Sequence, residues 1–494
     1  MGKSAKGRKK VAAIEDVECI SCKRIEWIAY TTPRRLHKFL YSRRNFLLAL
    51  AIAVVVYFGT SGQTEIVRRT AATFVFAAGC WALEVFPLPI TGLMIPIALS
   101  LLGVFSPKDA FAPFSHSIIF LMIGGLVLGQ SIRKHGLDKW IGYNLLTYSR
   151  GSIDRLVLLV MFAAAFLSWW MSNTVAIAVI LPVILSIMSA MPEELVNLRT
   201  KLLLGVSIST SIGGMAMLTG STPAMIAAAL LGESLPFGFL QWAYYGLPIS
   251  LLSLAIAFII LKVMYPSPRF TLDLDAIVEQ KNQSERWTGS QKKVMLVFSG
   301  TVFLWFMGSQ IEVWLGLPTS VSSAAIVSIL AVLTMFGLNL LDLKDLQQIQ
   351  WELIFLVGGG ILLGEAMIAS GAAGIMSNTI ASLHGSTPMI FMLLVLSLIS
   401  LTLTNFISNS ATAAILIPIA IDIARVLGIT PVPFVMAVAL SATIAFITPV
   451  GVPSTALVYS TGQISKEKLI KTGILTAIPT MLIALVTVWI LPIL

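Results

Sequence analysis

The sequence has few charged residues, and this scarcity decides the broad class of protein. Only 11% of its 494 residues are Asp, Glu, Lys or Arg, whereas a soluble globular protein has about 25%. Hydrophobic residues make up 57%, and the mean hydropathy is +0.91. The composition excludes a soluble enzyme, a disordered chain and a nucleic-acid-binding protein, and it predicts a polytopic membrane protein embedded in the lipid bilayer.

Cysteine and histidine are also scarce, which argues against other kinds of site. The three cysteines, Cys19, Cys22 and Cys80, cannot form a disulfide framework. Cys19 and Cys22 have zinc-like spacing, but no second Cys/His pair lies nearby, and a structural zinc ion needs four ligands. The four histidines show no metal-ligand spacing, and no nucleophile–base motif indicates intramembrane hydrolysis. We therefore expect a protein that is not an enzyme.

Long apolar runs predict an all-α fold. A spanning helix needs about 20 apolar residues, and eleven crossings are predicted at roughly 45–60, 70–86, 88–105, 113–134, 199–230, 237–264, 293–309, 318–337, 350–370, 432–460 and 469–493. Two further apolar segments, 155–190 and 387–424, carry a polar Ser-Asn pair in the middle. Polar, non-helical backbone is tolerated in a membrane only where it faces protein or water, so each segment is predicted to be a re-entrant hairpin.

The distribution of charge predicts the orientation in the membrane. The first 45 residues hold twelve Lys/Arg and four acidic residues. Because cytoplasmic segments are rich in Lys and Arg, the N-terminus should be cytoplasmic. About forty polar residues precede the first apolar run, which argues against a cleaved signal peptide. An odd number of crossings then places the C-terminus outside the cell (inner or plasma) membrane.

An internal repeat divides the chain. Residues 118–137 match 353–372 with eight identities in twenty, and residues 172–183 match 408–419 at nearly the same offset. Each copy would hold five crossings and one hairpin, so the second copy is inverted. Inverted repeats with paired helix breaks are typical of secondary transporters with a site at the membrane midplane. We predict a basic cytoplasmic tail (1–44), a first helix and loop (45–67), repeat 1 (68–265), a cytoplasmic loop (266–292) and repeat 2 (293–494).

The repeats share two sequence features besides their length. Gly125/Gly129 and Gly360/Gly364 have GxxxG spacing, which favours close helix packing. The hairpins read Ser172-Asn173-Thr174 and Ser408-Asn409-Ser410 at their centres, with Ser168 and Thr404 one helical turn earlier. Free N–H groups at helix starts suit anions, and free carbonyls at helix ends suit a hard cation such as Na+. The alternative is that these polar residues only form hydrogen bonds between helices.

These paired motifs, each followed by a Gly/Pro break at 219–223 or 448–455, resemble those of the divalent anion/sodium symporter family of di- and tricarboxylate transporters, in the ion transporter superfamily. Residues 81–97 also resemble the first repeat of that family. The resemblance covers roughly residues 45–494. It implies a homodimer in which a scaffold domain supports a mobile, elevator-type transport domain.

The resemblance also implies three sets of ligands. A first Na+ site would consist of Ser168, Ser172, Asn173 and Gly220. A second would consist of Thr404, Ile407 through its backbone, Asn409 and Gly451. The substrate carboxylates would contact Asn173, Thr174, Ser221, Asn409, Ser410 and Pro453.

Two departures from the family pattern bear on the substrate. Ser410 stands where the family usually has Thr, and Val452 removes a hydroxyl beside the substrate. The leading prediction is Na+-coupled symport of a C4 dicarboxylate such as succinate, malate or fumarate, with Na+ as the coupling ion. The alternatives are a Na+-independent dicarboxylate exchanger, a carrier of sulfate or a similar inorganic anion, and a channel. No Lys or Arg occurs at the centre of either hairpin, where a basic side chain could take the place of a bound cation, and this favours Na+.

Overall fold

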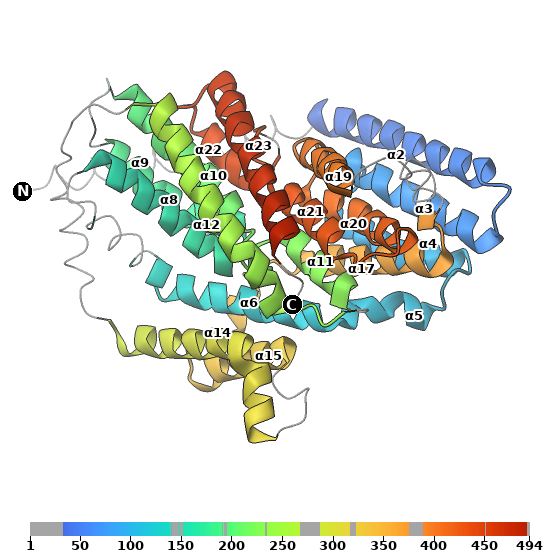
Figure 1. The fold of residues 1–494 in the computed structure, drawn as a ribbon, viewed down its shortest axis with the longest axis horizontal. Helices are drawn as coiled ribbons and strands as arrows, with labels where there is room; N and C mark the ends of the chain where they lie inside the picture. The colour runs from blue at the N-terminus through green and yellow to red at the C-terminus, as the bar shows by residue number, and fades with distance from the viewer. Residues whose placement is uncertain are drawn as a thin grey trace, which may run out of the picture.

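The computed structural model describes residues 33–138, 140, 148, 152–189, 191, 195–232, 235–266, 287–316, 323–374, 389–449 and 451–491. Every regular element in these ranges is a helix (Figure 1), which confirms the predicted all-α class. Cys19, Cys22 and most of the loop 266–292 lie outside the described residues. Helix α2 (Pro33–Gly59) begins inside the predicted tail, so the last part of that tail is helical.

The described helices fall into two halves of the chain. The first half contains α3 (Glu65–Ala82), α4 (Leu88–Leu101), α5 (Pro107–Phe111), η1 (Ala112–Ser115), α6 (Ser117–Lys134), α8 (Ile153–Trp170), α9 (Asn173–Ser189), α10 (Val196–Gly213), η2 (Leu218–Gly220), α11 (Thr222–Gly232) and α12 (Phe239–Met264). The second half contains α14 (Gly289–Leu315), α15 (Ala324–Gly337), α16 (Leu343–Leu346), α17 (Glu352–Ser370), α19 (Met389–Thr404), α20 (Asn409–Val426), α21 (Val432–Thr443), α22 (Pro453–Ser460) and α23 (Lys466–Ile490).

Local sequence signals set where several helices begin and end. The side chains of Thr64, Thr288 and Ser465 each accept a hydrogen bond from a backbone N–H in the first turn of the next helix. Helices α14 and α17 end at Gly316 (φ 63°) and Gly371 (φ 76°). This left-handed backbone favours glycine, which has no Cβ to clash with the carbonyl.

Six described helical segments are long and apolar enough to cross a membrane: residues 107–134 and helices α8, α12, α17, α20 and α23. Shorter apolar helices of 10–17 residues accompany them, among them α4, α9, α11, α15, α19 and α21. This pattern fits a multi-pass membrane protein that contains half-length helices. The number of crossings stays a prediction.

The two repeats pack crosswise. Helix α4 of the first repeat packs against α17 of the second, and α15 of the second packs against α6 of the first. A Cβ added at Gly359 in α17 would lie 2.5 Å from the carbonyl oxygen of Gly92 in α4. A Cβ added at the equivalent Gly124 in α6 would lie 2.3 Å from Cβ of Ser328 in α15, one residue beyond the position equivalent to Gly92. The two helix pairs are therefore counterparts under the repeat.

The GxxxG glycines form further close contacts, on another face of the same helices. In α6, a Cβ at Gly125 would lie 2.8 Å from the side chain of Thr219, the first residue of the Gly/Pro break at 219–223. In α17, a Cβ at Gly364 would lie 2.8 Å from the side chain of Leu230 in α11. The prediction that these glycines serve close packing is confirmed, because a side chain there would crowd the neighbouring residues.

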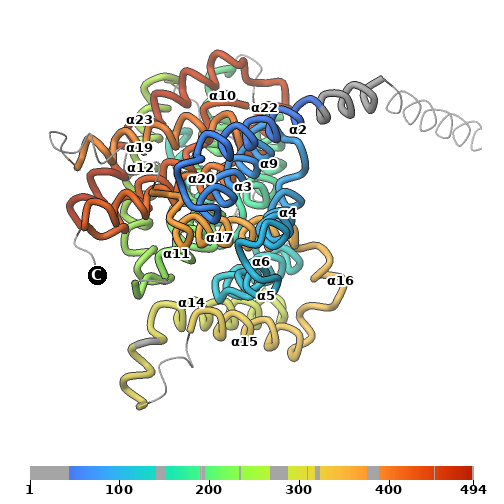
Figure 2. Tube along the Cα trace, turned by 90° about the vertical axis from the view of Figure 1, so that its right-hand side faces the viewer, coloured from blue at the N-terminus to red at the C-terminus, as the bar shows by residue number. Residues whose placement is uncertain are grey.

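The contacts divide the helices into two groups. Helices α4, α6, α15 and α17 form the crosswise set, with α2 and α3 packed at one end and α14 beside α15. Helices α8–α12 pack with one another and with α19–α23. Helices α14 and α15 lie along one side of the molecule in both views (Figures 1 and 2). The hairpin α8–α9 meets the first group at α6, and the hairpin α19–α20 meets it at α17 and α3.

Candidate functional site

The first hairpin breaks between Trp170, the last residue of α8, and Asn173, the first residue of α9. Ser168, in the last turn of α8, is fully buried. Its hydroxyl donates a hydrogen bond to Oδ1 of Asn173 at 2.7 Å. Asn173 keeps a second lone pair on Oδ1 for another partner. The hydroxyl of Ser172 is buried and has no hydrogen-bond partner among the described residues, so it can bond to a further polar group.

Carbonyl oxygens surround this tip. A Cβ at Gly214, just after α10, would lie 2.6 Å from Oδ1 of Asn173 and 3.1 Å from the carbonyl oxygen of Gly220. A Cβ at Gly220 would lie 2.7 Å from the carbonyl oxygen of Ser168 and 3.0 Å from that of Gly214. An amide oxygen and three carbonyl oxygens therefore lie close to these two glycines. Such an all-oxygen set suits a hard cation.

The second hairpin has the same construction. Thr404 is fully buried at the end of α19, and its hydroxyl has two acceptors within hydrogen-bond distance, the carbonyl oxygen of Ala442 and, at 3.3 Å, Oδ1 of Asn409. Its one proton is donated to one of them or shared between both. Ile407 lies in the short break between α19 and α20. A Cβ at Gly451 would lie 2.1 Å from the carbonyl oxygen of Ala445, so oxygen atoms border this tip too.

Two threonines connect the Gly/Pro breaks at 219–223 and 448–455 to the hairpin of the same repeat. Thr219 donates its hydroxyl to the carbonyl oxygen of Trp169 at 2.8 Å. Thr448 donates its hydroxyl to the carbonyl oxygen of Asn405 at 2.7 Å. Trp169 and Asn405 each follow the buried hydroxyl residue of their hairpin, so the acceptors of the two bonds are repeat counterparts. The sequence places these threonines in the breaks but does not indicate that they hold the breaks to the hairpins.

Asn405 is a positioning residue that the sequence analysis missed. Its side chain donates to the carbonyl oxygens of Leu401 and Ile444 and accepts from the backbone N–H of Ile447. It thus joins the end of α19 to the unwound segment that follows α21. Asn405 is 4% exposed. The signal in the sequence is an asparagine within an apolar run, because a buried amide is almost always hydrogen-bonded.

The substrate residues predicted from the sequence differ in exposure. Ser221 and Ser410 are 8% and 7% exposed, Asn173, Thr174 and Asn409 are half-buried, and Pro453 is exposed. The hydroxyl of Ser221 is buried without a hydrogen-bond partner in the described part of the chain. The same holds for the fully buried Ser454, which follows Pro453 and which the sequence analysis did not select.

Four helices begin at the breaks: α9, α11, α20 and α22. They pack in crossed pairs, because α22 contacts α9 and α11 contacts α20. Each helix start carries roughly half a positive charge. Since the predicted site residues include no ionisable side chain, the positive potential for a bound anion would come from these helix starts and from any bound cation.

Charged side chains hold the base of the first hairpin. Lys201 in α10 is fully buried, and its ammonium group lies 2.9 Å from a carboxylate oxygen of Asp154 at the start of α8. The other oxygen of Asp154 lies 2.9 Å from the ammonium group of Lys262 in α12, which is 56% exposed. These ion pairs join the first arm of the hairpin to two neighbouring helices.

Broken helices, paired hairpins and oxygen-lined tips define a multi-pass membrane transporter. A model of the CitMHS citrate transporter family matches residues 78–422 and 321–494. The chain belongs to this family of transporters, which confirms the resemblance to the ion transporter superfamily and the prediction that the protein is not an enzyme.

Individual relatives agree with this membership. The chain is 35% identical over 405 residues to an uncharacterized transporter of Methanocaldococcus jannaschii, covering 81% of this chain and 89% of the relative. It is 26% identical over 426 residues to the sodium-dependent dicarboxylate transporter SdcS of Staphylococcus saprophyticus, covering 81% and 82%. The crystal structure of the Alcanivorax borkumensis YdaH transporter has a similar fold, with a TM-score of 0.50, 16% identity, and coverage of 80% and 87%.

Proposed function

We propose that the protein is a Na+-coupled symporter of C4 dicarboxylates such as succinate, malate and fumarate, working by alternating access. The observation that carries the proposal is the repeated arrangement of a buried hydroxyl, an asparagine Oδ1 and nearby carbonyl oxygens at both hairpin tips. Two internal sets of cation ligands are more than a simple anion pore needs. The relative named as a sodium-dependent dicarboxylate transporter supports the same function.

In this proposal each tip binds one Na+. The first ion contacts Ser168, Ser172, Asn173 and Gly220, and the second contacts Thr404, Ile407, Asn409 and Gly451. Oxygen atoms are the ligands that hard cations prefer, and no ionised group of the protein has to be buried beside them. The bound cations then offset the charge of the dianion, so Na+ and substrate stabilise each other's binding.

The substrate carboxylates contact the helix starts in the same proposal. Asn173, Thr174 and Ser221 bind from the first repeat, and Asn409, Ser410 and Pro453 bind from the second. Val452 occupies the place of Ser221 in the second repeat, so the two carboxylates meet unequal sets of hydroxyl groups. Helices α8–α12 and α19–α23 form the mobile transport domain, and the other group of helices forms the scaffold of a homodimer.

The residue roles predict different kinetic effects. Thr174→Ala and Ser410→Ala lose a substrate donor and should chiefly raise the half-saturation concentration for succinate. Ser168→Ala and Thr404→Ala lose a cation ligand and should chiefly raise that for Na+. Because coupling between two ligands is reciprocal, a smaller effect on the other ligand must accompany each change.

Uptake into proteoliposomes tests the proposed function. Labelled succinate and labelled sulfate are supplied with an inward gradient of Na+, with K+ in its place, or with no gradient. Symport predicts concentrative succinate uptake only with Na+. Equal uptake in K+, accelerated by internal succinate, would identify an exchanger instead, and preferential sulfate uptake would identify an inorganic-anion carrier.

A further inference from the structure

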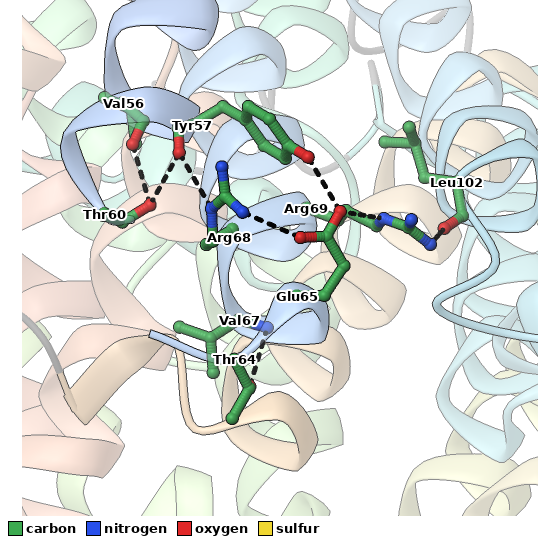
Figure 3. Close-up of polar contacts among 9 residues, drawn as sticks. All are labelled: Val56, Tyr57, Thr60, Thr64, Glu65, Val67, Arg68, Arg69 and Leu102. Carbon is green, nitrogen blue, oxygen red and sulfur yellow. Dashed lines mark hydrogen bonds and ion pairs between the residues drawn. The ribbon is translucent and has the colours of Figure 1, made fainter. Parts of the chain in front are cut away.

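A compact polar cluster lies where α2, α3 and α4 meet, far along the chain from the hairpins (Figure 3). The carboxylate of Glu65 accepts hydrogen bonds from the Tyr57 hydroxyl at 2.7 Å, from Nη1 of Arg68 at 2.9 Å and from Nε of Arg69 at 2.9 Å. Nη1 of Arg69 also donates to the carbonyl oxygen of Leu102 at 2.6 Å. The cluster therefore joins the ends of three helices.

The cluster has an excess of positive charge. One carboxylate, that of Glu65, faces the two guanidinium groups of Arg68 and Arg69. Arg68 is held further by its bond to the carbonyl oxygen of Tyr57 and by the Tyr57 ring, whose centroid lies 4.2 Å from Cζ. The side chain of Arg69 is 37% exposed. A guanidinium group has five N–H donors, and the bonds of Arg69 to Glu65 and Leu102 involve only Nε and Nη1.

An apolar groove begins at this cluster. Its volume is about 360 Å³, and its lining includes Leu50, Val54 and Phe58 of α2, Ala72 and Phe76 of α3, and Ala98 of α4. Arg69 is the one ionised residue among the groove-lining residues in the described part of the chain. Residues 50–58 span about 12 Å along a helix at 1.5 Å per residue. The volume holds about twelve groups of the size of a water molecule or a methylene.

The groove and the cluster fit two parts of one amphiphile. The predicted topology places the end of α2 at the outer membrane surface, where Arg69 would lie at the depth of lipid headgroups and the groove would extend into the hydrocarbon. An apolar chain matches the lining, and an anionic head matches the excess positive charge. The small, dianionic substrate of the proposed function has no apolar part to occupy this groove.

We propose that the groove between α2, α3 and α4 binds one acyl chain of an anionic phospholipid, whose phosphate contacts Arg69. The lipid would fill a concave surface that the helices leave uncovered and would connect the ends of three helices. The site is independent of the hairpin tips, so it stands whether or not the transporter is coupled to Na+.

The test compares two lipids with identical acyl chains. The full-length protein, purified in an uncharged detergent, is titrated with phosphatidylglycerol or phosphatidylcholine and analysed by native mass spectrometry. We expect tighter binding of phosphatidylglycerol. Arg69→Gln should weaken phosphatidylglycerol binding about fivefold, because a basic residue near anionic lipid contributes about 1 kcal/mol, and should leave phosphatidylcholine binding unchanged. Lys108→Gln, an exposed lysine at the start of α5, serves as the control and should change neither.

Arg69→Gln also removes the bonds of Arg69 to Glu65 and Leu102, so a second variant tests lipid binding without changing the polar cluster. Ala72→Phe fills the groove and leaves the polar cluster in place, so it should weaken the binding of both lipids. Equal affinity of the wild-type protein for the two lipids, or a preference for phosphatidylglycerol that persists in Arg69→Gln, would overturn the proposal. If Ala72→Phe converts a dimer to a monomer without changing lipid affinity, the groove is an interface between copies of the chain.

Discussion

Replacing Gly214 by alanine is a direct test of the first Na+ site, because the change adds a single methyl group between oxygen atoms. The new Cβ would lie 2.6 Å from Oδ1 of Asn173 and 3.1 Å from the carbonyl oxygen of Gly220. The first distance is shorter than a carbon and an oxygen tolerate, so the asparagine amide must move. Its hydrogen bond from Ser168 must change with it.

The size of the effect follows from what is displaced. If Asn173 loses its place as a Na+ ligand, the loss is comparable to that of a buried polar partner, about 1–3 kcal/mol. That range corresponds to an increase of the half-saturation concentration for Na+ by about fivefold to more than a hundredfold. Since Na+ and substrate binding are coupled, the half-saturation concentration for succinate should rise as well, by a smaller factor.

The assay is Na+-dependent succinate uptake into proteoliposomes at several fixed Na+ concentrations, with thermal unfolding in detergent as a check on the fold. Gly300→Ala in α14 is the matched control, because a Cβ there has no neighbour within 4 Å. It should behave as the wild-type protein does. An unchanged half-saturation concentration for Na+ in well-folded Gly214→Ala would refute the assignment of Asn173 to the cation.

Three further predictions address the tips, the hairpin base and the topology. Asn173→Ala and Asn409→Ala should each raise the half-saturation concentrations for both Na+ and succinate. Near wild-type kinetics in folded protein would mean that the polar residues 172–174 and 408–410 only form hydrogen bonds between helices. Asp154→Asn should lower the free energy of unfolding by about 3 kcal/mol, because it leaves buried Lys201 without that carboxylate. Lys262→Ala should lower it by less than about 1 kcal/mol, because Lys262 is exposed. Equal losses for the two variants in thermal unfolding would contradict this reasoning. A cysteine introduced at residue 280 should resist membrane-impermeant reagents in intact cells, and outside labelling would invert the predicted orientation.

The sequence was sufficient to predict the features that depend on neighbouring residues. Apolar runs predicted the helices, and the Ser-Asn pairs predicted where the hairpins break. The repeat predicted that Asn173 and Asn409 would stand at equivalent positions, and each has the hydroxyl of Ser168 or Thr404 within hydrogen-bond distance of its Oδ1, at 2.7 Å and 3.3 Å.

Features that depend on contacts between distant segments could not be predicted in the same way. Gly214 lies in the chain some forty residues after Asn173, and only the folded chain brings them together. Asn405 looked like one more polar residue beside Thr404, yet its bonds extend to Ile444 and Ile447. The hydropathy pattern also does not indicate which helices pack against each other, so the packing of α4 against α17 was not predicted.

The crosswise packing of the repeats has a consequence for biosynthesis. Gly92 leaves the ribosome long before Gly359, and the translation of the intervening residues takes about 13–53 s at 5–20 residues per second. During that time α4 and α6 are in the bilayer without α17 and α15, their partners in the finished protein. The small residues that later allow close contact leave shallow gaps for lipid in the meantime. A nascent chain halted after the first repeat would therefore be a half-assembled substrate for membrane chaperones and quality-control proteases.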